Sequence, residues 1–432
     1  MLVRFQPGVP KLRKGGRVVD GTGLENQRVK APQVRILSLP PGIMIRRRSR
    51  KIWMLPCLVL AGFLIFVGVR MISADTETEL HLTYTAPTTD FSGLDYTQEF
   101  GQWAVALNGK TIAKSADNLL AQPTASTAKM IMALAVMEKK PFSLGESGET
   151  ITITDELYNI YHLYSAINGS TTPVQIGEEI SEYDALASAL IASSNNMADA
   201  LAIWAFGSLP EYQKYAQEML ERLGANNTTV GPDASGFDAE TTSTAEDLAK
   251  IGEAVLRQPV LAEIVGKSSA VVPMAGLIEN TNKMLGVDGI VGVKTGYIGD
   301  TSGYCLVSGY KEGDEIITLT VLGAPNRQTS FDATLELVED AQQKITSRKL
   351  VEKGKEVGYF ENWWSGKTPI TTTEEKSGVI VSDAKASVNE AASEMEITSR
   401  ETDYTVSLHV DDYPERPSFW QRFLHVFGWK AE

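Results

Sequence analysis

The feature that most constrains this chain is an uncharged apolar run from Ile52 to Val69, which directly follows a basic segment over residues 44–51. The run has 18 residues, just enough for a helix to cross a bilayer. Because positively charged flanks stay on the cytoplasmic side, the rest of the chain is predicted to lie outside the cytoplasm. Residues 52–72 are therefore either a retained transmembrane anchor or a cleaved signal sequence, and the pattern leaves both open.

Residues 1–43 are rich in Gly, Pro and Arg and show no sustained periodicity, which indicates a disordered segment. The run over residues 16–26 resembles the peptide that results when a transfer-RNA gene is translated from a mistaken start. We therefore expect the natural chain to begin at Met44. The alternative is a genuine disordered tail in the cytoplasm.

The charge of the chain is unevenly distributed. Residues 1–51 hold 13 Lys/Arg and 2 Asp/Glu, whereas the remaining 381 residues hold 27 and 52 and carry a net charge of -25. An acidic main body argues against nucleic-acid binding. The only two cysteines, Cys57 and Cys305, lie in an apolar run and a strand-like segment, which makes a mutual disulfide unexpected. The four histidines are scattered, so we expect no metal site and no cofactor.

The second constraining feature is the segment 123–132, PTASTAKMIM, in which a serine begins an apolar helix and a lysine follows one turn later. Positions i and i+3 share one helix face, so the Ser126 hydroxyl and the Lys129 amine can meet. The helix is apolar almost all round and should be buried, which favours a neutral amine. A neutral amine beside a hydroxyl is a base beside a nucleophile. Taken alone, S-x-x-K is common, and a helix cap with an exposed lysine explains it equally well.

The pattern of elements around this helix predicts an α+β domain. A hairpin turns at Asn108-Gly109, a block of helices follows, and three strands and a closing helix complete the unit. This order fits an antiparallel sheet with helices on both faces, split by a helical insertion. Strands are predicted over residues 103–107, 110–115, 289–294, 303–309 and 315–322, and helices over 181–191, 197–206, 210–223, 243–257 and 331–348.

The composition of the remaining segments predicts the domain boundaries. Residues 73–98 are polar and resemble a spacer, which makes 99–349 the main domain. Residues 350–412 are rich in Thr, Val, Glu and Ser and indicate a small β domain. The tail over 413–432 is aromatic and partly basic, and it is either an interfacial membrane helix or a last helix docked on the β domain.

Two further motifs follow Ser126 in the main domain. Ser193-Ser194-Asn195 comes directly after a predicted helix, where a turn can present side chains to a cleft. Lys294-Thr295-Gly296 ends a predicted strand. Each motif alone also has a purely structural explanation, either as a turn or as an edge strand with an exposed lysine.

Together the three motifs, in this order and in these helix, turn and strand contexts, resemble those of the penicillin-recognising serine enzymes. The chain is similar to their D-alanyl-D-alanine carboxypeptidase branch, the low-molecular-weight penicillin-binding proteins of peptidase family S11, over roughly residues 85–350. The β domain and tail resemble that branch more weakly. The segments that carry the resemblance are Gly169-Ser170-Thr171, Asn196, 197–202, 223–228, Ser243-Thr244-Ala245, Asn280-Thr281-Asn282 and Gly303-Tyr304-Cys305.

The resemblance implies a catalytic serine and its partners. The substrate would be a peptidoglycan stem peptide ending in D-Ala-D-Ala, and Ser126 would attack its penultimate carbonyl while Lys129 takes the serine proton. Ser193 would pass a proton to the leaving amine, and Asn195 would hold Lys129 and the substrate amide by hydrogen bonds. β-Lactam antibiotics, which imitate the dipeptide, would act as inhibitors.

The same resemblance implies a substrate-binding strand. Lys294 would supply positive charge and, with Thr295, receive the terminal carboxylate of the substrate. Gly296 would let the substrate lie against the strand backbone. The backbone N–H groups of Ser126 and Tyr297 would form the oxyanion hole. The site would work at the extracytoplasmic face of the plasma membrane, in the cell-wall space.

Other functions on the same fold remain open. A class A β-lactamase needs a deacylating glutamate, usually in E-x-x-L-N, between the second and third motifs, and the segment 231–236 is a poor substitute for it. A transpeptidase or an endopeptidase would use the same residues on a different acceptor or bond. A non-catalytic cell-wall scaffold would be favoured by loss of Ser126 or Lys129, and both are present.

Overall fold

The computed structural model describes residues 51–72, 78–87, 91–97, 100–116, 118–273 and 275–429. The expectations for residues 1–43 and 44–50 lie outside the described residues. The chain divides into two units, Met1–Val69 and Arg70–Glu432, and each is described by itself.

The apolar run forms a single helix, α1, over Lys51–Ile72. Within it, Met54–Ile72 is long and apolar enough to cross a membrane by length and composition. Most of its large apolar side chains are exposed, whereas Val67 is buried. One such helix near the N-terminus is compatible with an anchor or with a signal sequence.

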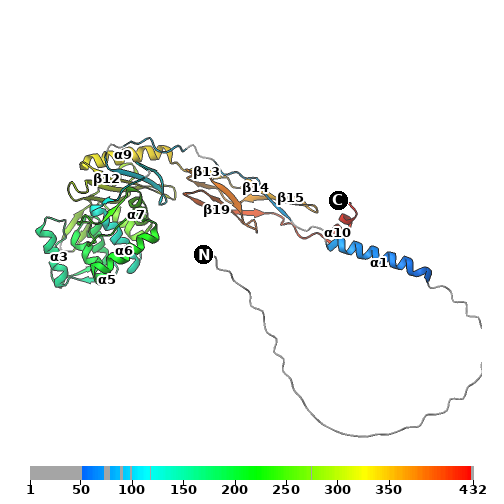
Figure 1. The fold of residues 1–432 in the computed structure, drawn as a ribbon, viewed down its shortest axis with the longest axis horizontal. Coiled ribbons are helices and arrows are strands. Elements are labelled where there is room, and N and C mark those ends of the chain that lie inside the picture. Colours follow the sequence, from blue (N-terminus) through cyan, green and yellow to red (C-terminus); the bar gives the residue numbers. More distant parts are fainter. Residues whose placement is uncertain are drawn as a thin grey trace, which may run out of the picture. The chain divides into compact units, whose positions relative to one another are not determined.

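The main domain is built on a five-stranded antiparallel sheet with the strand order β10-β11-β12-β2-β3 (Figure 1), which confirms the predicted type of sheet. The predicted strand 289–294 lies three residues later, at 292–297, so it contains Lys294-Thr295-Gly296 rather than ending at that motif. The hairpin turns at Asn108 and Gly109, which both adopt the positive φ that such a tight turn requires. Strand β10 lies at one edge, so one side of its backbone is open to a ligand. The strands are β2 (Gln102–Leu107), β3 (Lys110–Lys114), β10 (Gly292–Tyr297), β11 (Tyr304–Glu312) and β12 (Glu315–Ala324).

Helices cover both faces of this sheet, as predicted: Figure 1 shows α9 on one side of β12 and α7 on the other. The two faces bury separate apolar clusters, one holding Leu337 and Val338 of α9 and the other Leu248 and Ile251 of α7. Two successive strand residues, Leu306 and Val307, point into opposite clusters, as the pleat requires. The helices are α2 (Lys129–Lys139), α3 (Asp155–Ala166), α4 (Glu182–Leu190), α5 (Asn195–Phe206), α6 (Leu209–Leu223), α7 (Ala245–Arg257), α8 (Pro259–Val265) and α9 (Arg327–Lys344).

The closing helix differs from the predicted range 331–348. It begins four residues earlier, because the side chain of Asn326 caps it by accepting a hydrogen bond from the Thr329 N–H. It ends before residue 348, where Arg348 begins a strand. The earlier start places Arg327 in the first turn of α9.

A C-terminal β domain follows, as predicted. Its six-stranded sheet has the order β1-β14-β15-β19-β18-β17, and alternating burial along β18 and β19 marks one face as the core. Strand β1 (Glu79–Leu82) comes from the predicted spacer and pairs with β14, and its four residues are too short to carry a recognisable pattern. The other strands of this sheet are β14 (Glu356–Asn362), β15 (Gly366–Thr372), β17 (Lys385–Val388), β18 (Glu394–Thr398) and β19 (Asp403–Val410). Strands β13 (Arg348–Val351) and β16 (Lys376–Gly378) pair in a separate two-stranded sheet.

The tail contains a short amphipathic helix, α10 (Phe419–Val426), which starts with a capping box between Ser418 and Gln421. The ring of His425 stacks on Trp363 of the β14–β15 turn at a centroid distance of 3.9 Å. Trp420 points away from the domain and is 67% exposed. The helix therefore has features of both predicted alternatives, a docked face and an exposed aromatic face.

Candidate active site

The Ser126–Lys129 pair lies where a 3₁₀ turn, Ala125–Ala128, runs into α2. The two side chains meet as their spacing predicts, with Ser126 Oγ 2.8 Å from Lys129 Nζ. Ala125 adopts a positive φ of 48°, which is uncommon for a residue with a side chain and is typical of functional sites.

Lys129 is fully buried and has three polar neighbours. Its Nζ lies 2.8 Å from each of Ser126 Oγ, Asn195 Oδ1 and the Ser235 carbonyl oxygen. Burial lowers the pKa of Lys129 to about 7, although the negative charges of Asp233 and Asp199 act in the opposite direction. A substantial fraction of this amine is therefore neutral at physiological pH, as a general base must be.

Ser193 and Lys294 form a second contact pair. Ser193 sits between α4 and α5 with a positive φ of 62°, and its Oγ accepts a hydrogen bond of 3.0 Å from Lys294 Nζ. Lys294 is also buried, and its ammonium donates to the Thr295 carbonyl as well. Burial, followed by the nearby Lys129, lowers the pKa of Lys294 well below its ordinary value.

The edge strand β10 presents the third motif beside the serine. Thr295 Oγ1 lies 2.6 Å from Thr281 Oγ1. A Cβ added at Gly296 would lie 2.8 Å from the Thr124 carbonyl oxygen and 3.1 Å from the Ser126 nitrogen. Glycine is therefore needed at this position for the close approach of the strand to the serine turn, in addition to any role in admitting substrate.

These elements enclose a cavity of about 200 Å³ that opens between the serine turn, β10 and the start of α9. Five residues predicted from the sequence line it, while Lys129, Asn195 and Lys294 lie buried behind the wall. Tyr297 is half exposed and stacks on Tyr304 at a ring distance of 4.1 Å, which forms one rim. The lining residues are Ser126, Ser170, Ser193, Thr281, Thr295, Gly296, Tyr297, Tyr304, Cys305, Arg327, Ser330 and Phe331.

Besides Ser330 and Phe331 of the cavity lining, two contributors to this site are missing from the sequence prediction. Arg327 lines the cavity as an exposed residue, and within the part of the chain that the structure describes no hydrogen bond or ion pair engages its guanidinium. The other is the Ser235 carbonyl, which contacts Lys129 from the segment 231–236. The carboxylate in that segment, Asp233, accepts hydrogen bonds from N–H groups of its own loop.

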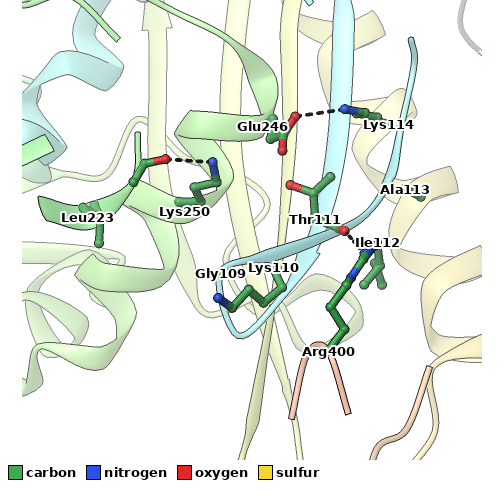
Figure 2. A pocket seen from close by; sticks show the side chains of 11 residues that line it. Gly109, Lys110, Thr111, Ile112, Ala113, Lys114, Leu223, Glu246, Lys250 and Arg400 are labelled. Atoms are coloured by element: carbon green, nitrogen blue, oxygen red, sulfur yellow. Dashed lines mark hydrogen bonds and ion pairs between the residues drawn. The ribbon is translucent and has the colours of Figure 1, made fainter. Parts of the chain in front are cut away.

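A larger cavity of about 730 Å³ lies between the β2–β3 hairpin, the end of α6, the start of α7 and Arg400 (Figure 2). It is lined by several cations, and three of them have partners. Lys114 pairs with Glu246 at 3.1 Å, and Lys250 donates to the Gly224 carbonyl at 2.9 Å. Arg400 donates to the Thr111 carbonyl oxygen at 2.7 Å.

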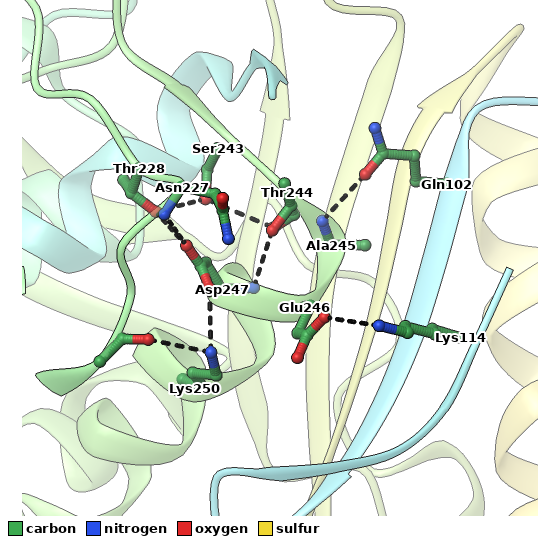
Figure 3. A network of polar contacts seen from close by, with 11 residues as sticks. Gln102, Lys114, Asn227, Thr228, Ser243, Thr244, Ala245, Glu246, Asp247 and Lys250 are labelled. Atoms are coloured by element: carbon green, nitrogen blue, oxygen red, sulfur yellow. Dashed lines mark hydrogen bonds and ion pairs between the residues drawn. The ribbon is translucent and has the colours of Figure 1, made fainter. Parts of the chain in front are cut away.

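The wall of this larger cavity is fixed by a polar network centred on Asp247 (Figure 3). The buried carboxylate accepts hydrogen bonds from the Asn227 N–H and from Lys250 Nζ. Thr244 caps α7 through the Asp247 N–H, so the helix begins two residues later than the predicted range 243–257. The hydroxyl of the preceding residue, Ser243, instead pairs with Thr228 Oγ1 at 2.7 Å. This network has a structural role and does not contact the serine site.

In the described ranges, no group of three or more His, Cys, Asp or Glu residues is arranged to hold a metal ion. The polar groups of the candidate site include the hydroxyls of Ser126 and Ser193, the two buried amines and the Asn195 amide. This set suits acyl transfer through a serine nucleophile.

Comparison with solved structures defines the class of fold. The structure matches a peptidoglycan synthesis regulatory factor, PBP3, from Streptococcus pneumoniae with a TM-score of 0.60 and 20% identity, over 73% of this chain and 99% of that one. It matches penicillin binding protein 6B from Escherichia coli with a TM-score of 0.56 and 17% identity, over 76% and 99%. The chain therefore has the DD-peptidase fold of the penicillin-binding proteins, with a C-terminal β domain.

Residues 104–326 match the family model of the peptidase S11 D-alanyl-D-alanine carboxypeptidases, and this chain belongs to that family. It is 25% identical to the D-alanyl-D-alanine carboxypeptidase DacF of Bacillus subtilis, over 58% of this chain and 63% of the relative. It is 26% identical to a D-alanyl-D-alanine endopeptidase of Pseudomonas aeruginosa, over 56% and 78%. The chain thus spans less than two thirds of the carboxypeptidase and a larger share of the endopeptidase.

Proposed function

We propose that this protein is a serine D-alanyl-D-alanine carboxypeptidase that removes the terminal D-Ala from peptidoglycan stem peptides. The observation that carries the proposal is the contact of Ser126 Oγ with a fully buried Lys129 amine whose pKa is lowered to about 7. Family membership supports the same reaction. Burial makes the amine a base near neutral pH, and the hydroxyl within its reach is the nucleophile.

In the first step, Ser126 Oγ attacks the penultimate D-Ala carbonyl while Lys129 takes its proton. The N–H groups of Ser126 and Tyr297 stabilise the oxyanion, and the tight packing of Gly296, next to Tyr297, against the serine turn supports this pairing. Ser193, bonded to Lys294, passes a proton to the amine of the departing D-Ala. Water then hydrolyses the ester on Ser126, which releases the shortened peptide and restores the enzyme.

The terminal carboxylate of the substrate binds between β10 and α9. Thr295 donates its hydroxyl, and Arg327, exposed at the cavity, supplies a planar cation suited to a carboxylate. Lys294 is buried behind Thr295, and a bound anion favours its charged form. The negative charge of the bound substrate thus stabilises protonated Lys294, which can supply the proton that Ser193 passes to the departing amine.

A DD-endopeptidase is the second candidate. The similarity to the Pseudomonas aeruginosa endopeptidase over 78% of that protein favours it. The bond cleaved would be a D-Ala-linked cross-link, and the same serine, lysines and oxyanion groups would act. Whether the protein acts as a carboxypeptidase or as an endopeptidase depends on which groups of the substrate, on the far side of the scissile bond, fit into the cavity.

The proposed place of action is the extracytoplasmic face of the plasma membrane. Helix α1 is long enough to act as a retained anchor or as a cleaved signal sequence. The exposed aromatic face of α10 is suited to the membrane interface, where aromatic rings reside between lipid and water.

The test uses the full-length protein in detergent beside Ser126→Ala. Each is incubated with a peptide ending in D-Ala-D-Ala, free D-alanine is assayed, and each is then labelled with a fluorescent penicillin. We expect the native protein to release D-alanine and to label, and the variant to do neither. Labelling without release would indicate an endopeptidase or a transpeptidase. Neither signal in a folded native protein would overturn the proposal and favour a scaffold.

A further inference from the structure

A buried carboxylate lies close to the active site without a part in the reaction above. Asp199 belongs to α5, four residues after Asn195, so both side chains lie on one face of that helix. Asp199 is only 3% exposed. An acid buried this deeply normally has a specific partner, because the loss of hydration is costly.

Asp199 has two partners from different parts of the fold. Its Oδ2 accepts a hydrogen bond of 2.7 Å from the Tyr164 hydroxyl of α3. Its Oδ1 accepts one of 2.9 Å from the backbone N–H of Ala234. Ala234 directly precedes Ser235, whose carbonyl contacts Lys129. Asp199 therefore holds the backbone one residue away from a polar neighbour of the general base.

The Tyr164 hydroxyl also lies 3.3 Å from Ser235 Oγ, which ties the same loop from a second direction. A Cβ on Gly236, which adopts a φ of 68°, would clash with the Ala125 carbonyl oxygen, so the loop packs tightly against the serine turn. The Ser235 carbonyl is thus fixed between α3, α5 and the serine turn.

The position of this carbonyl matters for the direction of the lysine lone pair. A neutral amine has two N–H donors and one lone pair, and Lys129 has three polar neighbours. The Asn195 and Ser235 carbonyl oxygens can only accept, so they take the two N–H groups. The lone pair is then left for the Ser126 hydroxyl, which is the geometry that proton removal requires.

We propose that Asp199 is a positioning residue for Lys129: through Ala234 and Tyr164 it holds the Ser235 carbonyl that orients the amine, and its negative charge sets how readily that amine gives up its proton. The inference rests on the proposed function, because it assigns Lys129 the role of base. It adds a residue that neither the three motifs nor the cavity lining contains.

The charges around Lys129 determine in which direction a change at Asp199 shifts the pKa of Lys129. The groups that face it are Asp199 of α5, Asp233 of the 231–236 segment and Lys294 of β10. The hydroxyls of Tyr164 and Tyr212 adjoin the two acids. Both carboxylates favour the ammonium form of Lys129, which cannot act as a base.

The titration of Asp199 overlaps that of the lysine. Burial, followed by the repulsion of Asp233, raises the pKa of Asp199 to about 7, while the Tyr164 hydroxyl, the Ala234 N–H and Lys129 act against that rise. The two groups change charge over the same pH range, and each affects the other. Removal of the Asp199 charge lowers the pKa of Lys129, so the base becomes competent at lower pH.

The test is the pH dependence of acylation by a fluorescent penicillin, measured on the full-length protein between about pH 5 and about pH 9. Asp199→Asn keeps an oxygen for the Ala234 N–H but removes the charge. We expect the acidic limb of the rate profile to move to lower pH by about one unit. Glu182→Gln is the matched control, because Glu182 is equally buried and its pKa is also raised to about 7, and we expect its limb to stay in place.

Tyr164→Phe provides a second variant with the same ring. It removes a donor that favours the charged form of Asp199, so the limb should move in the same direction by a smaller amount, and this variant decides if Asp199→Asn does not fold. If the acidic limb of the Asp199→Asn profile coincides with that of the native protein, Asp199 has only a structural role, even if the maximal acylation rate is lower. If the native protein is not acylated at all, the proposed function fails first and the inference fails with it.

Discussion

The two lysine-bearing cavities of the main domain differ in how their cations are held. Lys129 and Lys294 are buried beside hydroxyl, amide and carbonyl groups, and no carboxylate bonds directly to either amine in the described part of the chain. Lys114 and Lys250 of the larger cavity each pair with a carboxylate. A carboxylate partner stabilises an ammonium, whereas burial among neutral groups makes it release its proton. We therefore expect acid–base chemistry in the smaller cavity rather than in the larger one.

The largest effect is expected when the base of the smaller cavity is removed. Lys129→Met keeps the length and apolar stem of the side chain but removes the base, so the rate of acylation by a fluorescent penicillin should fall roughly a thousandfold. Stopped-flow or time-course labelling of the full-length protein measures it.

Lys250→Met is the matched control in the larger cavity, and its acylation rate should stay within a few-fold of the native value. An equal fall in the acylation rate of the two variants would show that the two cavities do not differ in acid–base function.

A smaller effect tests the assignment of Arg327. Loss of one charged hydrogen-bonding partner in Arg327→Gln should lower kcat/KM for a peptide ending in D-Ala-D-Ala about 10- to 100-fold. The matched substrate is the same peptide with a C-terminal amide, which has no carboxylate for the guanidinium to bind. Similar losses for the acid and the amide would rule out carboxylate recognition by Arg327.

The smallest effect is expected in the larger cavity. The Arg400 side chain is 67% exposed, and it donates to the Thr111 carbonyl and to the buried carboxylate of Glu401. Glu401 also accepts a hydrogen bond from the Ser382 hydroxyl, so Arg400→Ala should lower the free energy of unfolding by about 1 kcal/mol and leave acylation unchanged. Denaturant unfolding and penicillin labelling provide the two measurements. A clear fall in labelling would reveal a coupling between the β domain and the active site.

The sequence predicted the fold class where the signals were local. The Asn108-Gly109 turn predicted the first hairpin, and the apolar run around Lys129 predicted a buried helix. The limits of α9 were less predictable, because its start depends on a cap at Asn326 and its end on a strand at Arg348. Strand β1 could not be recognised, since four residues of a polar segment become a strand only when β14 is beside them.

The sequence by itself determined the spacing of Ser126 and Lys129, because one helical turn is a local geometry that needs no other part of the chain. Only the tertiary structure decided the rest of the site. Lys294 meets Ser193 across 101 residues of sequence, and Lys129 meets the Ser235 carbonyl across 106. Such contacts exist only after the sheet and its helices have packed, because burial and loop closure, rather than any local pattern, bring these groups to within 3 Å of each other.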